Sequence, residues 1–229
     1  MTGEMTRNLR FSFRTLRRAP AFTLAAVATL ALCLGANTAV FSVIDAVLFR
    51  PLPYPRPDRL AEVATEIRGP AGQGIEDSQD GAAWEALRQA RSFDLAAMGG
   101  GFTGVNLVSG GAAMYVQQSR CSAGYFRTLG IVPAIGREFT PDQDRVGGPP
   151  SAMLSYGLWR SAFHGDPSIV GRSILLRGEP HTVVGILPER FRSMAPADVW
   201  TPLRPSTRGE GGGTNYSFIA RLHDSATWA

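Results

Sequence analysis

The side chains that most often carry out chemistry are scattered through this sequence and form no motif. The three histidines, His164, His181 and His223, lie far apart, and the candidate metal-ligand pair is His164 with Asp166, two positions later. This pair follows a predicted helix, where a histidine suits the negative end of the helix dipole and an aspartate suits a turn. We therefore expect a structural role for the pair and predict neither a metal nor another cofactor.

Carboxylates and serines elsewhere give no stronger signal for catalysis. Glu138, Asp142 and Asp144 could attract a cation, but an ordinary solvated turn is the simpler interpretation of this acidic segment. Ser151 and Ser155 lack the flanking glycines of a nucleophile elbow, and the chain has no G-x-x-x-x-G-K-[ST] phosphate-binding loop. We therefore expect that the chain is not an enzyme and does not itself hydrolyse ATP.

One long apolar segment between Pro20 and Phe49 dominates the rest of the sequence. Its only ionisable side chains are Asp45 and the thiol of Cys33. About 20 apolar residues cross a bilayer core of roughly 30 Å, so residues 20–49 are predicted to form a transmembrane helix that extends beyond the hydrocarbon. A cleaved secretory signal is the alternative, because a basic start followed by an apolar run also fits that template. The length of both segments favours an uncleaved anchor.

Residues 1–19, before the apolar run, are predicted to form a basic amphipathic segment on the cytoplasmic side of the membrane. Cationic segments next to a span stay on that side, and they can lie flat on anionic lipid. Two roles remain open for them: fixing the topology alone, or docking a cytoplasmic partner. The arginines concerned are Arg7, Arg10, Arg14, Arg17 and Arg18. Residues 50–229 are then expected to lie outside the membrane as one domain.

Small residues recur every fourth position within the apolar run, at Ala31, Gly35 and Ala39. Such a stripe lets another helix approach closely, which is how transmembrane helices pack in lipid. A lone helix whose alanine-rich composition gives the stripe by chance is the alternative. We predict that the stripe packs against another helix, although a single anchor would not need it.

The charge distribution argues against nucleic-acid binding. The formal net charge is +4 and the chain contains no lysine, so every positive side chain apart from histidine is an arginine. Much of the excess lies in residues 1–19, and later arginines are interspersed with Asp and Glu rather than gathered with aromatic residues. We therefore expect no nucleic-acid partner.

The remainder reads as short strands and short helices, which predicts an α+β domain. The predicted strands are 60–67, 105–108, 114–119, 174–176, 182–187, 198–203 and 216–222. The predicted helices are 82–91, 122–129 and 155–163, with Ser122 and Ser155 as N-caps. Residues 68–81 are expected to be a loop, and the glycine-rich stretch 209–213 a flexible connection. Hairpin turns are expected at 110–111 and 177–180.

The sequence resembles the amino-terminal part of MacB-like ABC transporter permeases of the FtsX/MacB family. The resemblance rests on segments that occur in order along the chain: RTLRRAP, LCLGANTAVFSVIDAVLFRPLPYPRPDRL, CSAGYF, GREFT, LSYGLW, GDP, VVGILP and DVW. It implies one transmembrane helix followed by a two-lobed periplasmic core domain. It also implies that this chain stops before the further helices of the family, as a fragment, a truncated gene product or part of a split permease.

The resemblance further implies a location and a set of partners. The chain would lie in the bacterial inner membrane with its N-terminus in the cytoplasm and its main domain in the periplasm. Its expected partners are the lipid bilayer, a second copy or a related permease half, an ABC ATPase subunit acting in trans, and a periplasmic adaptor protein. It would couple that ATPase to the periplasmic domain. The alternative is an anchored periplasmic interaction domain, or an inactive remnant, without transport activity.

Overall fold

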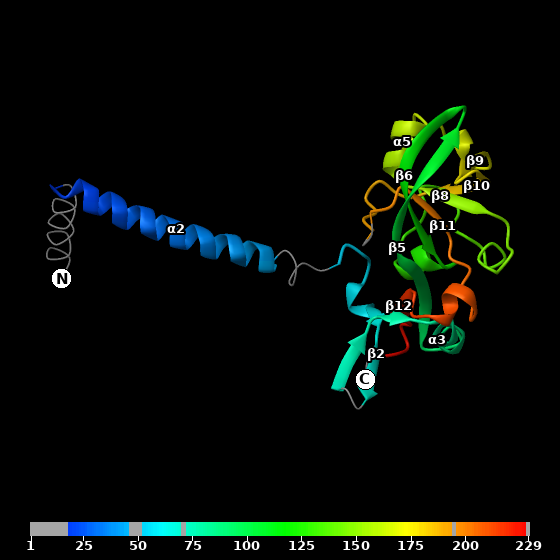
Figure 1. Cartoon of the computed structure of the whole chain (residues 1–229), viewed down its shortest axis with the longest axis horizontal. Coiled ribbons are helices and arrows are strands. Elements are labelled where there is room, and N and C mark those ends of the chain that lie inside the picture. The colour runs from blue at the N-terminus through cyan, green and yellow to red at the C-terminus, as the bar shows by residue number, and fades with distance from the viewer. Residues whose placement is uncertain (1–17, 46–51, 70–71, 194–195, 228–229) are drawn as a thin grey trace. The chain divides into compact units, whose positions relative to one another are not determined.

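The computed structural model describes residues 18–45, 52–69, 72–193 and 196–227 of the chain. The chain divides into two units, Met1–Leu52 and Pro53–Ala229. The first unit contains the long helix α2, and the second contains the sheets and the short helices (Figure 1).

Helix α2 (Pro20–Ile44) is 25 residues long and has no buried residue. It is long and apolar enough to cross a membrane, and among the described residues it alone passes that test. Proline suits its first turn because no helical partner exists there for the missing N–H. The hydroxyls of Thr29, Thr38 and Ser42 each donate to the carbonyl four residues earlier, which satisfies them inside the helix, as an apolar surrounding requires.

The second unit is built on one mixed ten-stranded sheet. Its strands are β1 (Leu60–Val63), β4 (Ser78–Gln79), β5 (Phe93–Ser109), β6 (Ala112–Cys121), β7 (Ile135–Gly136), β8 (Ser151–Leu154), β9 (Ser173–Leu176), β10 (Glu179–Ile186), β11 (Val199–Pro202) and β12 (Tyr216–Leu222). A separate hairpin consists of β2 (Thr65–Gly69) and β3 (Gly72–Glu76). The helices are α3 (Gly81–Leu87), α4 (Tyr125–Thr128) and α5 (Tyr156–Ala162), with the 3₁₀ turns η2 (Pro57–Arg59), η3 (Pro167–Ile169) and η4 (Gly209–Gly212). The predicted class of short helices and mixed strands is confirmed.

Six of these strands close into a small barrel. The ring runs β5–β6–β11–β8–β10–β9 and returns to β5, because β9 pairs with both β10 and the end of β5. Two of its pairs, β6 with β11 and β8 with β10, are parallel, and the others are antiparallel. The barrel core contains the inward side chains of these strands together with Leu158 and Trp159 from α5. Closure leaves few unpaired strand edges in this part of the domain.

The rest of the sheet is held by the last strand. β12 lies between β1 and β5 and is antiparallel to both, so the chain returns to the strand that follows the apolar helix. Helix α3 packs there through Trp84, whose ring centroid lies 5.7 Å from that of Phe218. Trp200 of β11 is fully buried, in ring contact with Tyr125 and Phe126.

Several expected elements differ in the structure. The strand predicted over 60–67 is two strands, β1 and β2, and the loop predicted over 68–81 contains β3 and β4. The stretch 209–213, expected to be a flexible connection, contains the short 3₁₀ turn η4. Ser122 is not an N-cap: its Oγ accepts a hydrogen bond from the Ala97 N–H of β5, and the N-cap of α4 is Gly124. A buried strand donor competes for the same hydroxyl that a helix would use.

The other predicted helices and hairpins are confirmed. Ser155 caps α5, with its Oγ 3.1 Å from the Leu158 nitrogen. The helix predicted over 82–91 is α3, whose N-cap is Asp80. β5 and β6 turn at Gly110 and Gly111, and β9 and β10 turn at Arg177 and Gly178.

Candidate functional site

The small-residue stripe lies on one side of α2, because four residues are slightly more than one helical turn. Ala31, Gly35 and Ala39 are all exposed, and no atom lies within 4 Å of the place a Cβ on Gly35 would take. Thr38 beside the stripe uses its hydroxyl within the helix, with Oγ1 2.8 Å from the Leu34 carbonyl oxygen. Packing of the stripe against another helix stays a prediction.

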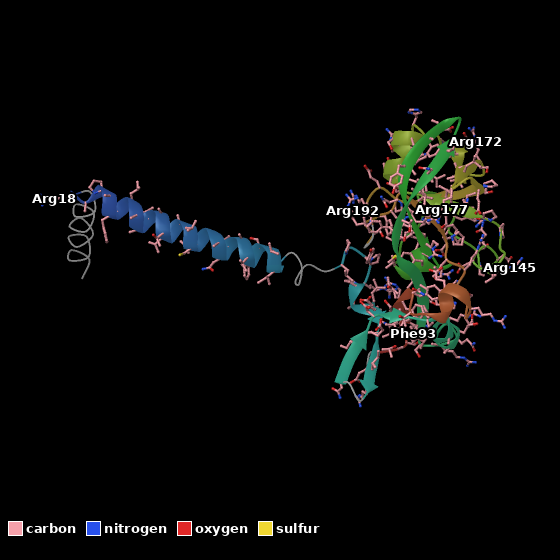
Figure 2. All side chains as sticks on the ribbon, viewed as in Figure 1. Arg18, Phe93, Arg145, Arg172, Arg177 and Arg192 are labelled. Atoms are coloured by element: carbon pink, nitrogen blue, oxygen red, sulfur yellow. The ribbon has the colours of Figure 1, made fainter. Side chains whose placement is uncertain are left out.

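The basic segment is described only at its last arginine. Arg18 is exposed at the start of α2, where Figure 2 labels it. The other four arginines of the prediction, Arg7, Arg10, Arg14 and Arg17, lie outside the described residues. Their role on the membrane surface or in topology therefore also stays a prediction.

In the second unit, one groove is polar and has a volume of about 490 Å³. It lies where β6 and β11 meet the β9–β10 turn and η4. Its charged side chains are Arg120, Arg177, Glu179, Arg204 and Glu210, with His181 and Gln118 beside them. This composition favours hydrogen bonding and charge pairing over the burial of an apolar ligand.

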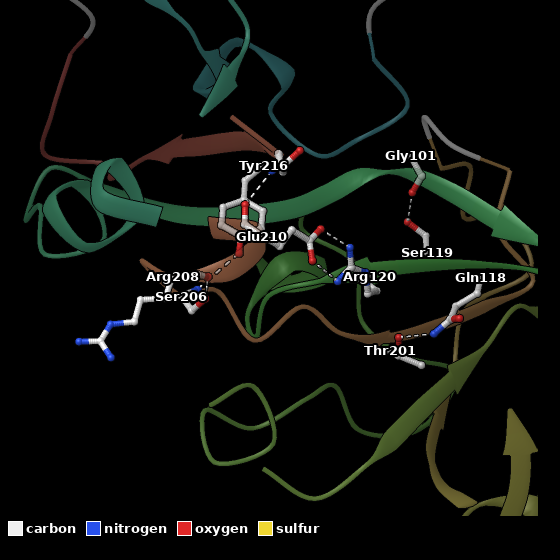
Figure 3. Close-up of polar contacts among 10 residues, drawn as sticks. Gly101, Gln118, Ser119, Arg120, Thr201, Ser206, Arg208, Glu210 and Tyr216 are labelled. Atoms are coloured by element: carbon white, nitrogen blue, oxygen red, sulfur yellow. Dashed lines mark hydrogen bonds and ion pairs between the residues drawn. The ribbon is translucent and has the colours of Figure 1, made fainter. Parts of the chain in front are cut away.

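One ion pair closes the side of this groove. Arg120 of β6 reaches Glu210 of η4 with two hydrogen bonds, Nη1 to Oε2 at 2.8 Å and Nη2 to Oε1 at 2.5 Å (Figure 3). The hydrogen bond from Arg120 lowers the pKa of Glu210, and the same bond raises the pKa of Arg120. The pair fixes η4 on the sheet across 90 positions of sequence.

Neighbouring polar groups hold the same face of the sheet. Gln118 Nε2 donates to Thr201 Oγ1 at 2.8 Å, which joins β6 to β11. The Ser206 N–H donates to the Tyr216 hydroxyl at 3.4 Å and fastens the connection before η4. Gln118 Oε1 is buried without a hydrogen-bond partner among the described protein groups. Four of the residues that line the groove, Gln118 with Thr201 and Arg120 with Glu210, thus already bond one another in pairs.

Asp144 joins three loops near this groove. Its Oδ2 accepts from the Ala123 N–H at 2.8 Å, and its Oδ1 accepts from the Arg204 N–H at 2.7 Å. The Arg204 guanidinium in turn donates to the Gly148 carbonyl at 2.6 Å. Burial raises the pKa of Asp144 to about 6, although these backbone donors act in the opposite direction. The acidic segment is therefore not wholly a solvated turn: Asp142 faces solvent, but Asp144 points inward.

The other residues considered for chemistry have separate structural neighbours. His164 has the left-handed φ of 53° that suits the end of α5, and His223 Nε2 lies 3.2 Å from Asp94 Oδ1. Ser151 is buried, and its Oγ accepts from Gln143 Nε2 at 2.6 Å. Across the described parts of the chain, no three His, Cys, Asp or Glu residues gather as a metal site would require.

Comparison with known proteins gives a consistent result. A sequence model described as the MacB-like periplasmic core domain matches residues 23–229. A search of the curated proteins finds no match.

Solved structures with the same fold include three from bacteria. The periplasmic region of MacB from Actinobacillus actinomycetemcomitans has 14% identity and a TM-score of 0.54, over 74% of this chain and 77% of that one. The extracellular domain of the noncanonic ABC-type transporter YknZ from Gram-positive bacteria has 15% identity and a TM-score of 0.51, over 72% and 84%. A domain of a putative permease protein from Porphyromonas gingivalis has 16% identity and a TM-score of 0.57, over 76% and 79%. At these identities the likeness establishes the fold.

Proposed function

This chain belongs to the MacB-like periplasmic core domain family, and from that premise we propose that it is the membrane-anchored permease portion of an ABC-type export or mechanotransmission system. The observation that carries the proposal is the extent of the family match, which starts at residue 23 and so includes most of α2 as well as the whole sheet. An apolar helix and this domain are thus matched as one continuous unit.

The proposed orientation places the N-terminus in the cytoplasm and residues 50–229 in the periplasm or outside the cell. The arginines before α2 support it, because cationic segments next to a span stay on the cytoplasmic side. A reporter fused after Ala229 should then be active outside, and one placed before Arg7 should be active inside. The reverse pattern would contradict this orientation.

The proposed mechanism is transmission of work rather than chemistry. An ABC ATPase acting in trans would move α2, and the domain would respond through β1, the first strand after that helix. β1 is paired with β12 over Leu60–Val63, and β12 is paired with β5 over seven residues, so a displacement of β1 would be shared with the sheet. A periplasmic adaptor protein would receive it.

Dimerisation through α2 belongs to the same proposal. A second copy or a related permease half would pack on Ala31, Gly35 and Ala39, where the absence of large side chains allows close approach. Gly35→Leu should weaken self-association of the chain in lipid, measured by energy transfer between labelled copies. Cys33→Leu, roughly on the opposite side of the helix, is the matched control and should leave association unchanged. Equal association in all three proteins would remove the packing claim.

The coupling itself is tested with purified components. The full chain is co-expressed with each ABC ATPase encoded in the same genome, and the rate of ATP hydrolysis is measured in nanodiscs with and without the chain. The proposal expects one ATPase to co-purify and to change its rate when the chain is present. If every ATPase fails on both counts, the anchored interaction domain without transport activity becomes the better account.

A further inference from the structure

One edge of strand β6 is paired with another strand over only part of its length. On one side it pairs with β5 as far as Ala112, but on the other side β11 covers only Gln118–Cys121. One further residue is covered by Asp198, whose N–H donates to the Gln117 carbonyl at 2.8 Å and whose Oδ2 accepts from the Gln117 N–H at 2.9 Å. Residues 112–116 have no strand partner on this side among the described residues.

The direction of the free backbone groups follows from this contact. Gln117 points both its N–H and its C=O away from β5, and in an antiparallel pair this direction alternates from residue to residue. The N–H and C=O groups of Tyr115 and Ala113 therefore point toward the open edge as well. They offer two donors and two acceptors at the spacing of a strand.

A trough of about 430 Å³ runs along this edge, with α5 as its other wall. Figure 1 draws α5 beside β6 at this end of the barrel. The helix presents small residues to the trough, Gly157, Ser161 and Ala162, and no atom lies within 4 Å of the place a Cβ on Gly157 would take. The buried side chains of Val116 and Leu158, which belong to the barrel core, form an apolar floor.

We propose that this edge binds an extended segment of a partner polypeptide, which adds to the sheet as a strand beside residues 112–116. Its main chain would bond to the groups of Ala113 and Tyr115, and its alternate side chains would lie on the apolar floor. Asp198 supplies the only charge that lines the trough in the described part of the chain. The segment would therefore carry a lysine, an arginine or a free amino terminus at that end.

The shape of the trough favours a single extended segment over a second copy of this chain. The β6 edge of a second copy carries its own α5 on the side that would have to enter the trough. Two such edges would bring two helices together before the strands reached the separation of about 4.8 Å that pairing needs. A lone strand has no such wall.

The test begins with selection of a peptide on the full chain in nanodiscs. Random eight-residue peptides displayed on phage are selected on the wild-type chain and counter-selected on Gly157→Leu. The leucine enters open space in a helix, so the variant should fold while its side chain fills the trough. We expect enriched peptides with alternating apolar residues and a basic end. If no peptide is enriched over Gly157→Leu, the proposal is overturned.

The enriched peptide is then synthesised with a fluorescein label and its affinity measured by anisotropy. Tyr115→Pro removes the free N–H at the edge, where proline is tolerated, and Tyr115→Ala removes the ring but keeps that donor. Tyr115→Pro should bind about tenfold more weakly than Tyr115→Ala, as expected for one main-chain hydrogen bond. Every second residue of the bound peptide would direct its N–H toward β6. N-methylation of those amides should weaken binding, and N-methylation of the intervening amides should not.

Two results would overturn the proposal at this stage. Equal affinity of Tyr115→Pro and Tyr115→Ala, with both variants folded by circular dichroism, would show that the edge donors are not used. Insensitivity of binding to N-methylation of either set of amides would show that the peptide does not bind as a strand. Neither result depends on an ATPase, so this test and the test of coupling can fail separately.

Discussion

Gly136→Ala should destabilise the domain more than the same change at a comparable glycine, because β7 and β10 approach each other through two glycines. Gly136 has a φ of 77°, and a Cβ there would lie 2.3 Å from the Val184 carbonyl oxygen. Its partner Gly185 is as tightly placed, since a Cβ on it would lie 2.4 Å from the Arg137 carbonyl oxygen. An alanine at 136 therefore meets both backbone strain and a backbone atom that cannot move freely.

The magnitude can be worked from these two terms. A left-handed alanine costs roughly 1–2 kcal/mol relative to glycine. Moving β7 away from Val184 would also break the hydrogen bond from the Arg137 N–H to the Val184 carbonyl, now 3.0 Å long, at about 1 kcal/mol. We expect Gly136→Ala to lower the free energy of unfolding by about 2–3 kcal/mol.

Two matched substitutions separate these terms. Gly171 has a φ of 92° but no atom within 4 Å, so Gly171→Ala should cost only the strain, about 1–2 kcal/mol. Gly157 lies in α5 in open space, so Gly157→Ala should stabilise by up to about 1 kcal/mol. The free energies come from urea unfolding of the chain in micelles, followed by tryptophan fluorescence. If Gly136→Ala loses no more stability than Gly171→Ala, the close approach of β7 and β10 is not what requires glycine.

Three further predictions concern polar contacts inside the domain. Ser122→Ala leaves the buried Ala97 N–H without its acceptor and should lower the free energy of unfolding by about 1–3 kcal/mol in the same assay. No loss of stability would contradict this prediction and would indicate that water replaces the hydroxyl. Because burial raises the pKa of Asp144 from 3.8 to about 6, the folded protein holds this proton more tightly than the unfolded chain. The stabilisation from this tighter binding, up to roughly 3 kcal/mol, is full below about pH 3.8 and is lost as the pH rises to about 6. Asp144→Asn should therefore flatten the pH dependence of the free energy of unfolding between these pH values. An unchanged slope would contradict the raised pKa of Asp144. A double-mutant cycle with Arg120→Ala and Glu210→Gln should give a coupling energy of about 0.5–1 kcal/mol, since both side chains are partly exposed, and zero coupling would show that the pair does not hold η4.

Sequence alone could predict the elements that are fixed by caps and turn residues close to them in the chain. α5 could be predicted because Ser155 caps it and its apolar residues repeat at helical spacing, and the hairpin of β9 and β10 could be predicted from its turn residues. The same logic failed for β4, a two-residue strand of polar side chains that exists because β12 pairs with it. It also failed for Ser122, because the sequence does not show that Ala97 would compete for its hydroxyl.

The polar groove and the open edge of β6 could not be predicted from sequence, because both depend on contacts between residues far apart in the chain. The contact between Arg120 and Glu210 depends on how η4 folds back onto the sheet, and no spacing rule joins residues so far apart. The edge of β6 is open because β11 is four residues long while β6 has ten, a mismatch that only the pairing reveals. The residues named from sequence for helix packing and topology, by contrast, stay predictions, since they concern contacts with lipid or with another chain.

The place of β12 in the sheet has a consequence for how the domain is made. β1 and β5 emerge from the ribosome early, but the strand that lies between them, Tyr216–Leu222, is synthesised some 150 residues after β1 and more than 100 after β5. Until then β1 lacks its neighbour, and such distant pairing slows folding. If the domain crosses a membrane while it is being synthesised, the edge of β1 would stay unpaired until Tyr216–Leu222 follows, and an unpaired strand edge is prone to aggregation.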